Sequence, residues 1–428
     1  MVQGKYTIKG KKVDQVIQRH LDAAVEELKK IKNIGSILLV GGFAQGEGSV
    51  VIENGRIIPV NDYDLYVLVD KKLGEDLLNK IARKIEKGLG SSGYSLYEHS
   101  KKSFYFDIRQ LKISDLPKLA PLAKYYQLKH ASQLLYGKDY RNMIKITKKD
   151  IPLSDPLRFL FNRMSHMIEW FPVDDFKKEK MLKWKRETLL YDISKAYMEC
   201  CTALVLLKGK YAPTYRGRTK NLKKIYNTEF PELANKYPEL IKRIEYFTKI
   251  KVEPKYAGMD HVKIWFEAKE HLFAVAEFYM KSMKDCDLYD FYPKISEEYL
   301  RPYSTHFLKN RLGTTTRRLV SITSFAVQFY LRLLWFVRIA KHRHRLYFRV
   351  LLPGGDPGLQ IFSALPFLME SIDNEGEING KNLQKAYSNL RRIYPTKVKI
   401  GDNLETFDQL REEYSDAWRL YFFQKIGG

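Results

Sequence analysis

Two short apolar runs near the N-terminus constrain the fold of this 428-residue chain more than any other feature. SILLVGG, residues 36–42, is compact and ends in a glycine pair, which suits a buried strand better than a helix. DYDLYVLV, residues 62–69, alternates and then becomes continuously apolar, so it predicts a central strand with acidic residues at its leading end. A β-sheet is therefore expected in the N-terminal part of the chain.

The segments around these runs complete an N-terminal domain. Apolar residues at helical spacing predict helices over 12–32 and 74–87. Asn54-Gly55 lies between two β-branched runs and predicts a hairpin over 50–60 with a type I′ turn. FYFDIRQL, residues 104–111, predicts a further strand. The expected fold class is α+β, with a mixed sheet and helices followed by a mainly α-helical C-terminal region.

The remainder of the chain is dominated by helical periods. Long helices are expected over 183–207 and 263–281, and the segment YLRPY, residues 299–303, predicts a break. The predicted domains are residues 1–150, which hold the sheet, residues 151–300, which are helical, and residues 301–428, which form a basic helical C-terminal region.

Net charge and cysteine usage indicate which partners and which cellular compartment suit this protein. The formal net charge is +24, which favours phosphate-rich or anionic partners. The three cysteines form no CxxC pair, and no secretory signal is readable, so a cytoplasmic protein is expected. The apolar stretch 319–340 is long enough to span a bilayer but carries Arg332 and Arg338. A buried amphipathic helix, and not an integral membrane protein, is the prediction.

Three carboxylates are candidates for metal binding. Asp62 and Asp64, at positions i and i+2 of a strand, project to the same face and can hold the same divalent cations, Mg²⁺ or Mn²⁺. Asp107 lies within the next apolar strand, where an unpaired carboxylate is costly. Asp115 is a rival third acid, although an aspartate before a short Pro-containing helix is more often an N-cap. Gly41 and Gly42 leave room for backbone N–H groups to approach a triphosphate.

This pattern resembles the nucleotidyltransferases of the DNA polymerase β superfamily, in which a strand ends in Gly-Gly or Gly-Ser, Asp-x-Asp lies on a later strand, and a third acid follows. The resemblance covers residues 35–112 and implies nucleotide binding at Gly41 and Gly42, metal ligation by Asp62, Asp64 and Asp107, and a role of Asp107 in activating the incoming hydroxyl. Gly42 stands where many members have serine. The spacer from Phe43 to Asn61 has 19 residues, longer than usual, which the predicted hairpin explains.

The resemblance also implies a helical domain that closes over the nucleotide with basic and aromatic side chains. Lys195, in the predicted helix over 183–207, is the candidate nucleotide-binding lysine. The segment KYAPTYRGR, residues 210–218, contains further basic and aromatic residues that are candidates for nucleotide contact. A solvated basic loop is the simpler interpretation of this segment. Glu47 is explained equally well by proximity to the site and by a first-turn acid that complements a helix dipole.

The expected function is transfer of a nucleoside monophosphate from a nucleoside triphosphate to an acceptor hydroxyl, with release of pyrophosphate. The acceptor stays open between a small molecule, RNA and a protein. Residues 311–350 hold nine Lys or Arg and no Asp or Glu, and could meet RNA or an anionic surface. The alternative is therefore an inactive protein with this fold that binds RNA or an anionic membrane through its basic C-terminal region.

Overall fold

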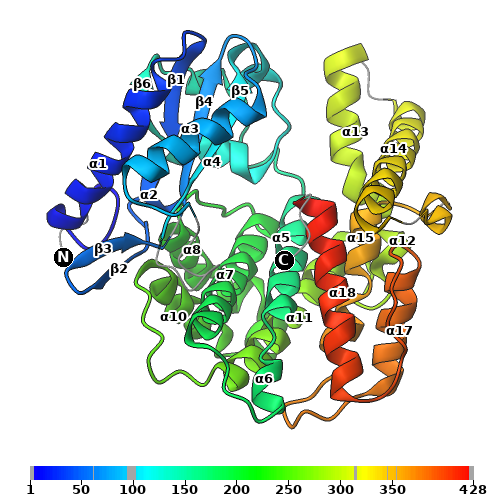
Figure 1. Ribbon diagram of the computed structural model, residues 1–428. Coiled ribbons are helices and arrows are strands. Elements are labelled where there is room, and N and C mark those ends of the chain that lie inside the picture. Colours follow the sequence, from blue (N-terminus) through cyan, green and yellow to red (C-terminus); the bar gives the residue numbers. More distant parts are fainter. Residues whose placement is uncertain are drawn as a thin grey trace. The chain divides into compact units, whose positions relative to one another are not determined.

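The computed structural model describes residues 4–60, 62–93, 103–312, 316–344, 346–352 and 354–423 (Figure 1). The chain divides into two compact units that interleave in sequence. Unit 1 comprises Met1–Pro152 and Leu182–Gly258, and unit 2 comprises Leu153–Met181 and Met259–Gly428. This division differs from the three consecutive segments predicted from sequence, because the helices of residues 182–258 group with the sheet and not with the rest of the predicted helical domain.

Unit 1 contains the predicted mixed sheet, which has four strands. Its order is β5-β4-β1-β6, and β4 and β5 are parallel whereas β1 is antiparallel to both β4 and β6. The strands are β1 (Ile34–Leu39), β4 (Tyr63–Val69), β5 (Phe106–Lys112) and β6 (Gln133–Gly137). The edge strand β6 was not predicted, because its apolar run, Leu134 to Tyr136, is short and all of its residues are partly or fully exposed.

The predicted hairpin forms a separate two-stranded sheet of β2 (Val50–Glu53) and β3 (Arg56–Pro59). Asn54 and Gly55 have φ values of 49° and 77°, so both central residues are left-handed, as a type I′ turn requires. The extra residues between the Gly-Gly pair and the Asp-x-Asp segment therefore form this hairpin and leave the order of the main strands intact.

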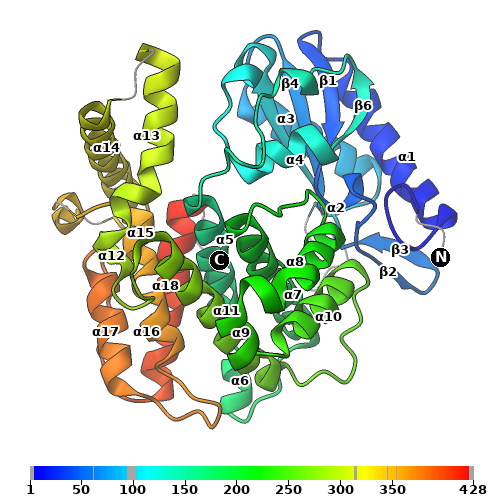
Figure 2. The same cartoon turned by 180° about the vertical axis from the view of Figure 1, so that it is seen from behind.

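The helices of unit 1 cover both faces of the sheet (Figures 1 and 2). One face packs against α1 and α3 through side chains such as Leu21, Ile85 and Val67. The other packs against η1 and α4 through Leu116 and Leu128. The remaining helices, α7 to α10, include α7 with the predicted bounds. The elements are α1 (Lys11–Leu28), α2 (Gly41–Ala44), α3 (Glu75–Gly88), η1 (Ile113–Lys118), α4 (Ala123–Ala131), η2 (Arg141–Met143), α7 (Lys183–Leu207), α8 (Tyr215–Glu229), α9 (Pro231–Lys236) and α10 (Leu240–Val252).

Unit 2 is mainly helical, which confirms the predicted α-helical C-terminal region. Aromatic side chains from distant segments fill its core; for example, the ring of Phe161 stacks on Phe291 and Phe362. The elements are α5 (Ser154–Glu169), α6 (Val173–Phe176), α11 (His261–Lys284), α12 (Phe291–Lys294), α13 (Ser296–Leu312), α14 (Arg317–Arg343), η3 (Phe348–Leu351), α15 (Pro357–Phe362), α16 (Leu365–Met369), α17 (Gly380–Arg391) and α18 (Leu404–Phe422).

Two expectations about the C-terminal region are wrong. The break predicted at residues 299–303 lies inside α13, which continues through Pro302 because Leu300 and Leu308 on either side are buried and hold the helix against its neighbours. The apolar stretch 319–340 forms a helix, α14, but it is not a buried one, since only 22% of its most apolar window is buried.

Candidate functional site

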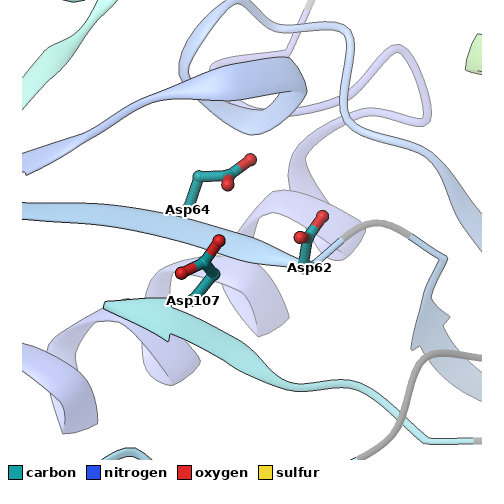
Figure 3. Close-up of side chains that lie close together, drawn as sticks. All are labelled: Asp62, Asp64 and Asp107. Carbon is teal, nitrogen blue, oxygen red and sulfur yellow. The ribbon is translucent and has the colours of Figure 1, made fainter. Parts of the chain in front are cut away.

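The acidic triad, Asp62, Asp64 and Asp107, comes together in unit 1 (Figure 3). Asp64 and Asp107 are paired positions on the parallel strands β4 and β5, and Asp62 precedes β4 by one residue. Residues two apart on a strand share a face, so all three side chains meet on one side of the sheet. One carboxylate oxygen of each lies within 4.8 Å of the others, and all three side chains are half-buried.

The charge of the acidic triad is only partly compensated. Burial raises the pKa of Asp64 well above its usual value, and the negative charges of Asp62 and Asp107 raise it further. Arg109 and Lys251 oppose this effect without cancelling it. Clustered carboxylate oxygens with excess negative charge are the donor set that a hard divalent cation prefers. The residues present therefore fit Mg²⁺ or Mn²⁺.

Neighbouring side chains hold two of the carboxylates in place. The Tyr105 hydroxyl donates a hydrogen bond of 2.9 Å to Oδ2 of Asp62. The guanidinium of Arg109, two residues after Asp107 on the same face of β5, forms an ion pair with Oδ2 of Asp107. Sequence analysis did not single out Arg109, although its i+2 spacing from Asp107 was a usable signal.

The backbone of Gly41 lies directly beside Asp64 of the acidic triad. Its φ is +71°, and a Cβ atom added to it would lie 2.6 Å from Oδ2 of Asp64. Glycine is therefore required here both by conformation and by space. Gly42 is buried in the short helix α2, and its carbonyl accepts a hydrogen bond of 2.9 Å from the backbone N–H of Glu47.

Lys195 lies on α7, with its ammonium 3.7 Å from Oδ1 of Asp192 and 4.2 Å from the ring centroid of Tyr191. Its charge is close enough to Lys251 to lower the pKa of that lysine. The sequence-predicted lysine therefore belongs to a cationic group in unit 1, together with a residue that sequence analysis missed.

Lys251, on α10, is that missed residue and is almost fully buried, at 1% exposure. Its ammonium lies 3.3 Å from the Ser49 hydroxyl and 5.2 Å from the ring centroid of Tyr215. Burial and the charge of Lys195 lower the pKa of Lys251 to about 7, while Glu47, Asp62 and Asp64 act in the opposite direction. A lysine between Ile250 and Val252 in an apolar helix face was the available sequence signal.

Glu47 connects the sheet to the helical part of unit 1. Its buried carboxylate accepts hydrogen bonds from the backbone N–H groups of Tyr215 (2.7 Å) and Arg216 (3.0 Å) and from Nε of Arg216 (3.0 Å). It therefore satisfies two N–H groups at the start of α8, a helix distant in sequence, and not those of its own first turn.

The segment expected to be a solvated basic loop is structured. Its last residues begin α8, and Tyr211 and Arg218 are buried at 4% and 3% exposure. Nη1 of Arg218 donates to the Thr202 hydroxyl at 2.7 Å, and its guanidinium lies over the Tyr215 ring. Asp115 lies in the first turn of η1 and neither caps that turn nor joins the acidic triad.

The arrangement of a mixed sheet, flanking helices and a nearby acidic triad is compatible with a polymerase β-like nucleotidyltransferase. No protein-family model matches the chain, and no curated protein matches it. A separate pocket of about 350 Å³ lies in unit 2, and no member of the acidic triad lines it. The geometry of the triad itself is thus the basis for any functional assignment.

Proposed function

We propose that this protein is a metal-dependent nucleotidyltransferase that moves a nucleoside monophosphate from a nucleoside triphosphate to an acceptor hydroxyl. The observation that carries the proposal is the meeting of Asp62, Asp64 and Asp107 within 4.8 Å on adjacent strands. Asp62, Asp64 and Asp107 would together hold one or two divalent cations. Such cations would stabilise the negative charge on the attacking and leaving oxygens.

The remaining steps of the transfer reaction are assigned to residues of the protein itself. Asp107, which Arg109 holds in one orientation, accepts the proton of the acceptor hydroxyl as its oxygen bonds to the α-phosphorus. The bond from that phosphorus to the oxygen bridging to the β-phosphate breaks, and pyrophosphate leaves. The absence of a side chain at Gly41 keeps the space beside Asp64 open for the reacting phosphate.

The cationic group supports binding of the triphosphate. Lys195 and Lys251 come from different helices, and their charges interact with each other. Lys251 also interacts with Asp62 and Asp64, which places positive charge next to the acidic triad. A polyanionic substrate would offset the repulsion between the two lysines and so bind with a favourable electrostatic term.

The test is pyrophosphate release from each of the four nucleoside triphosphates with Mg²⁺ or Mn²⁺, in the presence and absence of total RNA. Asp64→Asn and the double variant Asp62→Ala/Asp64→Ala are expected to lower turnover by at least about a hundredfold. Asp115→Asn is the matched control, because this aspartate lies outside the acidic triad. Turnover that survives in the Asp64 variants would contradict the assignment.

Comparing pyrophosphate release with and without RNA tests which kind of acceptor the protein uses. Release that depends on RNA indicates an RNA acceptor, whereas release without it directs the search to small molecules or proteins. The competing proposal, an inactive protein that binds RNA or an anionic membrane, expects no turnover with any nucleotide and binding that survives loss of the carboxylates. Residence in the cytoplasm stays a prediction.

A further inference from the structure

Helix α14 exposes a continuous apolar stripe on unit 2. Its exposed apolar side chains recur every three or four residues, which places them along one side of the helix. These side chains, here called the apolar stripe, are Leu319 (37% exposed), Ile322 (56%), Phe325 (66%), Phe329 (55%), Leu333 (44%) and Val337 (54%). The stripe runs for about 27 Å at the α-helical rise per residue. Large apolar side chains in such a contiguous exposed row mark an interaction site.

The opposite side of α14 is packed against unit 2 and includes a buried charge. Trp335 and Ile339 are fully buried there, and so is the guanidinium-bearing Arg332, at 4% exposure. Arg332 donates to the carbonyl oxygens of Val350 (2.8 Å) and Gly355 (3.0 Å) and to Oε1 of Gln360 (2.9 Å). This side thus packs the helix against the rest of unit 2: Arg332 faces inward, whereas Phe325 and Phe329 face outward.

Neighbouring segments extend the exposed apolar surface. Leu346, Phe348 and Leu352 around η3 are each at least 60% exposed, and the Phe348 ring lies 5.3 Å from that of Phe336 on α14. Helix α13 lies beside α14 in both views (Figures 1 and 2), joined by a 2.9 Å hydrogen bond between Ser324 and Ser304. The exposed Phe307 belongs to this helix.

Exposed cations flank the apolar stripe at both ends. Arg317 and Arg318 lie at its start, and Lys341 and Arg349 lie beyond its end. Residues 311–350 contain no acidic residue that could pair with them. The exposed Glu297 of α13, which accepts a 3.2 Å hydrogen bond from Ser321 of α14, is ion-paired with Arg301. A surface with an apolar centre and cations at both ends is complementary to an anionic bilayer, whose headgroups meet the cations while the apolar side chains enter the acyl boundary.

We propose that the apolar stripe of α14 and its flanking cations form a membrane-interface surface that binds bilayers containing anionic lipid. Within the part of the chain that the structure describes, α14 is the one helix long and apolar enough to cross a membrane. Its buried side, with Arg332 bonded to unit 2, can face lipid only if the unit comes apart, so the helix lies in the plane of the interface.

Two other occupants agree less well with the same observations. A second copy of the chain would bring the cations at the ends of one stripe close to those of the other, and residues 311–350 hold no acid that could offset their repulsion. RNA would be expected to follow a row of cations, whereas the centre of the stripe, from Leu319 to Val337, exposes apolar side chains. The proposal does not depend on the transferase activity.

The experiment is co-sedimentation of the full-length protein with vesicles of phosphatidylcholine alone or of equal parts phosphatidylcholine and phosphatidylserine. Binding is expected only to the anionic vesicles and is expected to weaken with salt. The double variant Phe325→Gln/Phe329→Gln should bind the anionic vesicles at least about tenfold more weakly, because it removes two large apolar side chains from the bilayer contact. Arg317→Glu/Arg318→Glu should weaken binding by about fivefold or more per residue.

The matched control is Ile52→Gln/Leu77→Gln, which removes two exposed aliphatic side chains from unit 1 and should leave vesicle binding unchanged. Circular dichroism and thermal unfolding verify that each variant is folded. Absence of binding to anionic vesicles by the wild type overturns the proposal. So does a dimer in solution that the phenylalanine variant abolishes while vesicles go unbound, and so does RNA binding that only the arginine variant abolishes while vesicles go unbound.

Discussion

Gly41 and Asp64 are spatially matched: a Cβ atom on Gly41, whose φ is +71°, would lie 2.6 Å from Oδ2 of the aspartate. The first residue of α2, just after β1, therefore lies too close to the acidic triad to carry a side chain. This relationship places the first glycine of the Gly-Gly pair beside a carboxylate of the same sequence pattern.

The first prediction concerns Gly41→Ala. The new methyl group would displace the Asp64 carboxylate, so we expect pyrophosphate release to fall at least about tenfold, with a loss of stability of about 1 kcal/mol from the left-handed backbone. Gly55→Ala is the control, because Gly55 also has positive φ, +77°, but nothing within 4 Å of an added Cβ. Equal activity losses in the two variants would show that backbone strain alone is responsible.

The second prediction concerns metal binding at Asp64, independently of turnover. Because the pKa of Asp64 is raised in the folded protein, the folded state binds more protons than the unfolded state above the usual aspartate pKa, and stability from this group falls as pH rises through that range. Asp64→Asn should therefore raise the metal-free melting temperature at pH 7. It should also remove most of the stabilisation that Mg²⁺ or Mn²⁺ gives the wild type.

Thermal unfolding with and without EDTA measures both effects, and Asp115→Asn should behave like the wild type. A metal-dependent stabilisation that persists fully in Asp64→Asn would place the cation elsewhere.

The third prediction concerns Lys251→Met. Burial and the charge of Lys195 lower the pKa of Lys251 from 10.5 to about 7. Between pH 7 and pH 10.5 the unfolded chain therefore binds more protons than the folded chain. The contribution of Lys251 to stability consequently rises with pH across this range. At pH 7 and below, the charged lysine is unfavourable. Lys251→Met should therefore stabilise the protein, on the order of 2 kcal/mol, while nucleotide affinity falls.

Lys249→Met, on the exposed side of the same helix, is the matched control and should change neither property much. Urea unfolding and nucleotide titration at pH 6, 7 and 8 would check the pair. A destabilised Lys251→Met protein with unchanged nucleotide affinity would make Lys251 a structural residue only.

The fourth prediction concerns Glu47→Gln. The glutamate accepts backbone hydrogen bonds from Tyr215 and Arg216 with both carboxylate oxygens, and an amide nitrogen in place of one oxygen would face an N–H donor. We expect a loss of about 2 kcal/mol, typical of a buried charged hydrogen bond. Glu232→Gln, an exposed acid in the first turn of α9, should cost much less. Chemical denaturation of both variants makes the comparison.

The fifth prediction concerns His20, which stacks on Phe104 and lies 2.8 Å from the Tyr63 hydroxyl. Burial and the charge of Arg19 lower its pKa from 6.5 to about 4, so the unfolded state binds the extra proton between these values. Its contribution to stability is complete above pH 6.5 and is lost as pH falls towards 4. His20→Phe should flatten the pH dependence of unfolding in this range, which urea unfolding at several pH values would measure.

Much of the N-terminal fold follows from local patterns. The Asn54-Gly55 turn, the central strand that begins after Asp62 and the long helix over 183–207 were all predicted, because turn chemistry and apolar periodicity act over a few residues. The edge strand β6 escaped prediction because a half-exposed strand lacks a strong apolar pattern.

Local sequence patterns were enough to predict that Asp62 and Asp64 share a face, because strand geometry repeats every two residues. The apolar run around Asp107 likewise predicted a third acid on a later strand. Three features could be seen only in the folded chain: Asp107 aligns with Asp64 in parallel register, Lys251 interacts with Glu47 although the two are far apart in the sequence, and α14 exposes its apolar side. Pairing register, long-range burial and the choice of which helix face packs depend on contacts between distant segments. No local pattern carries that information.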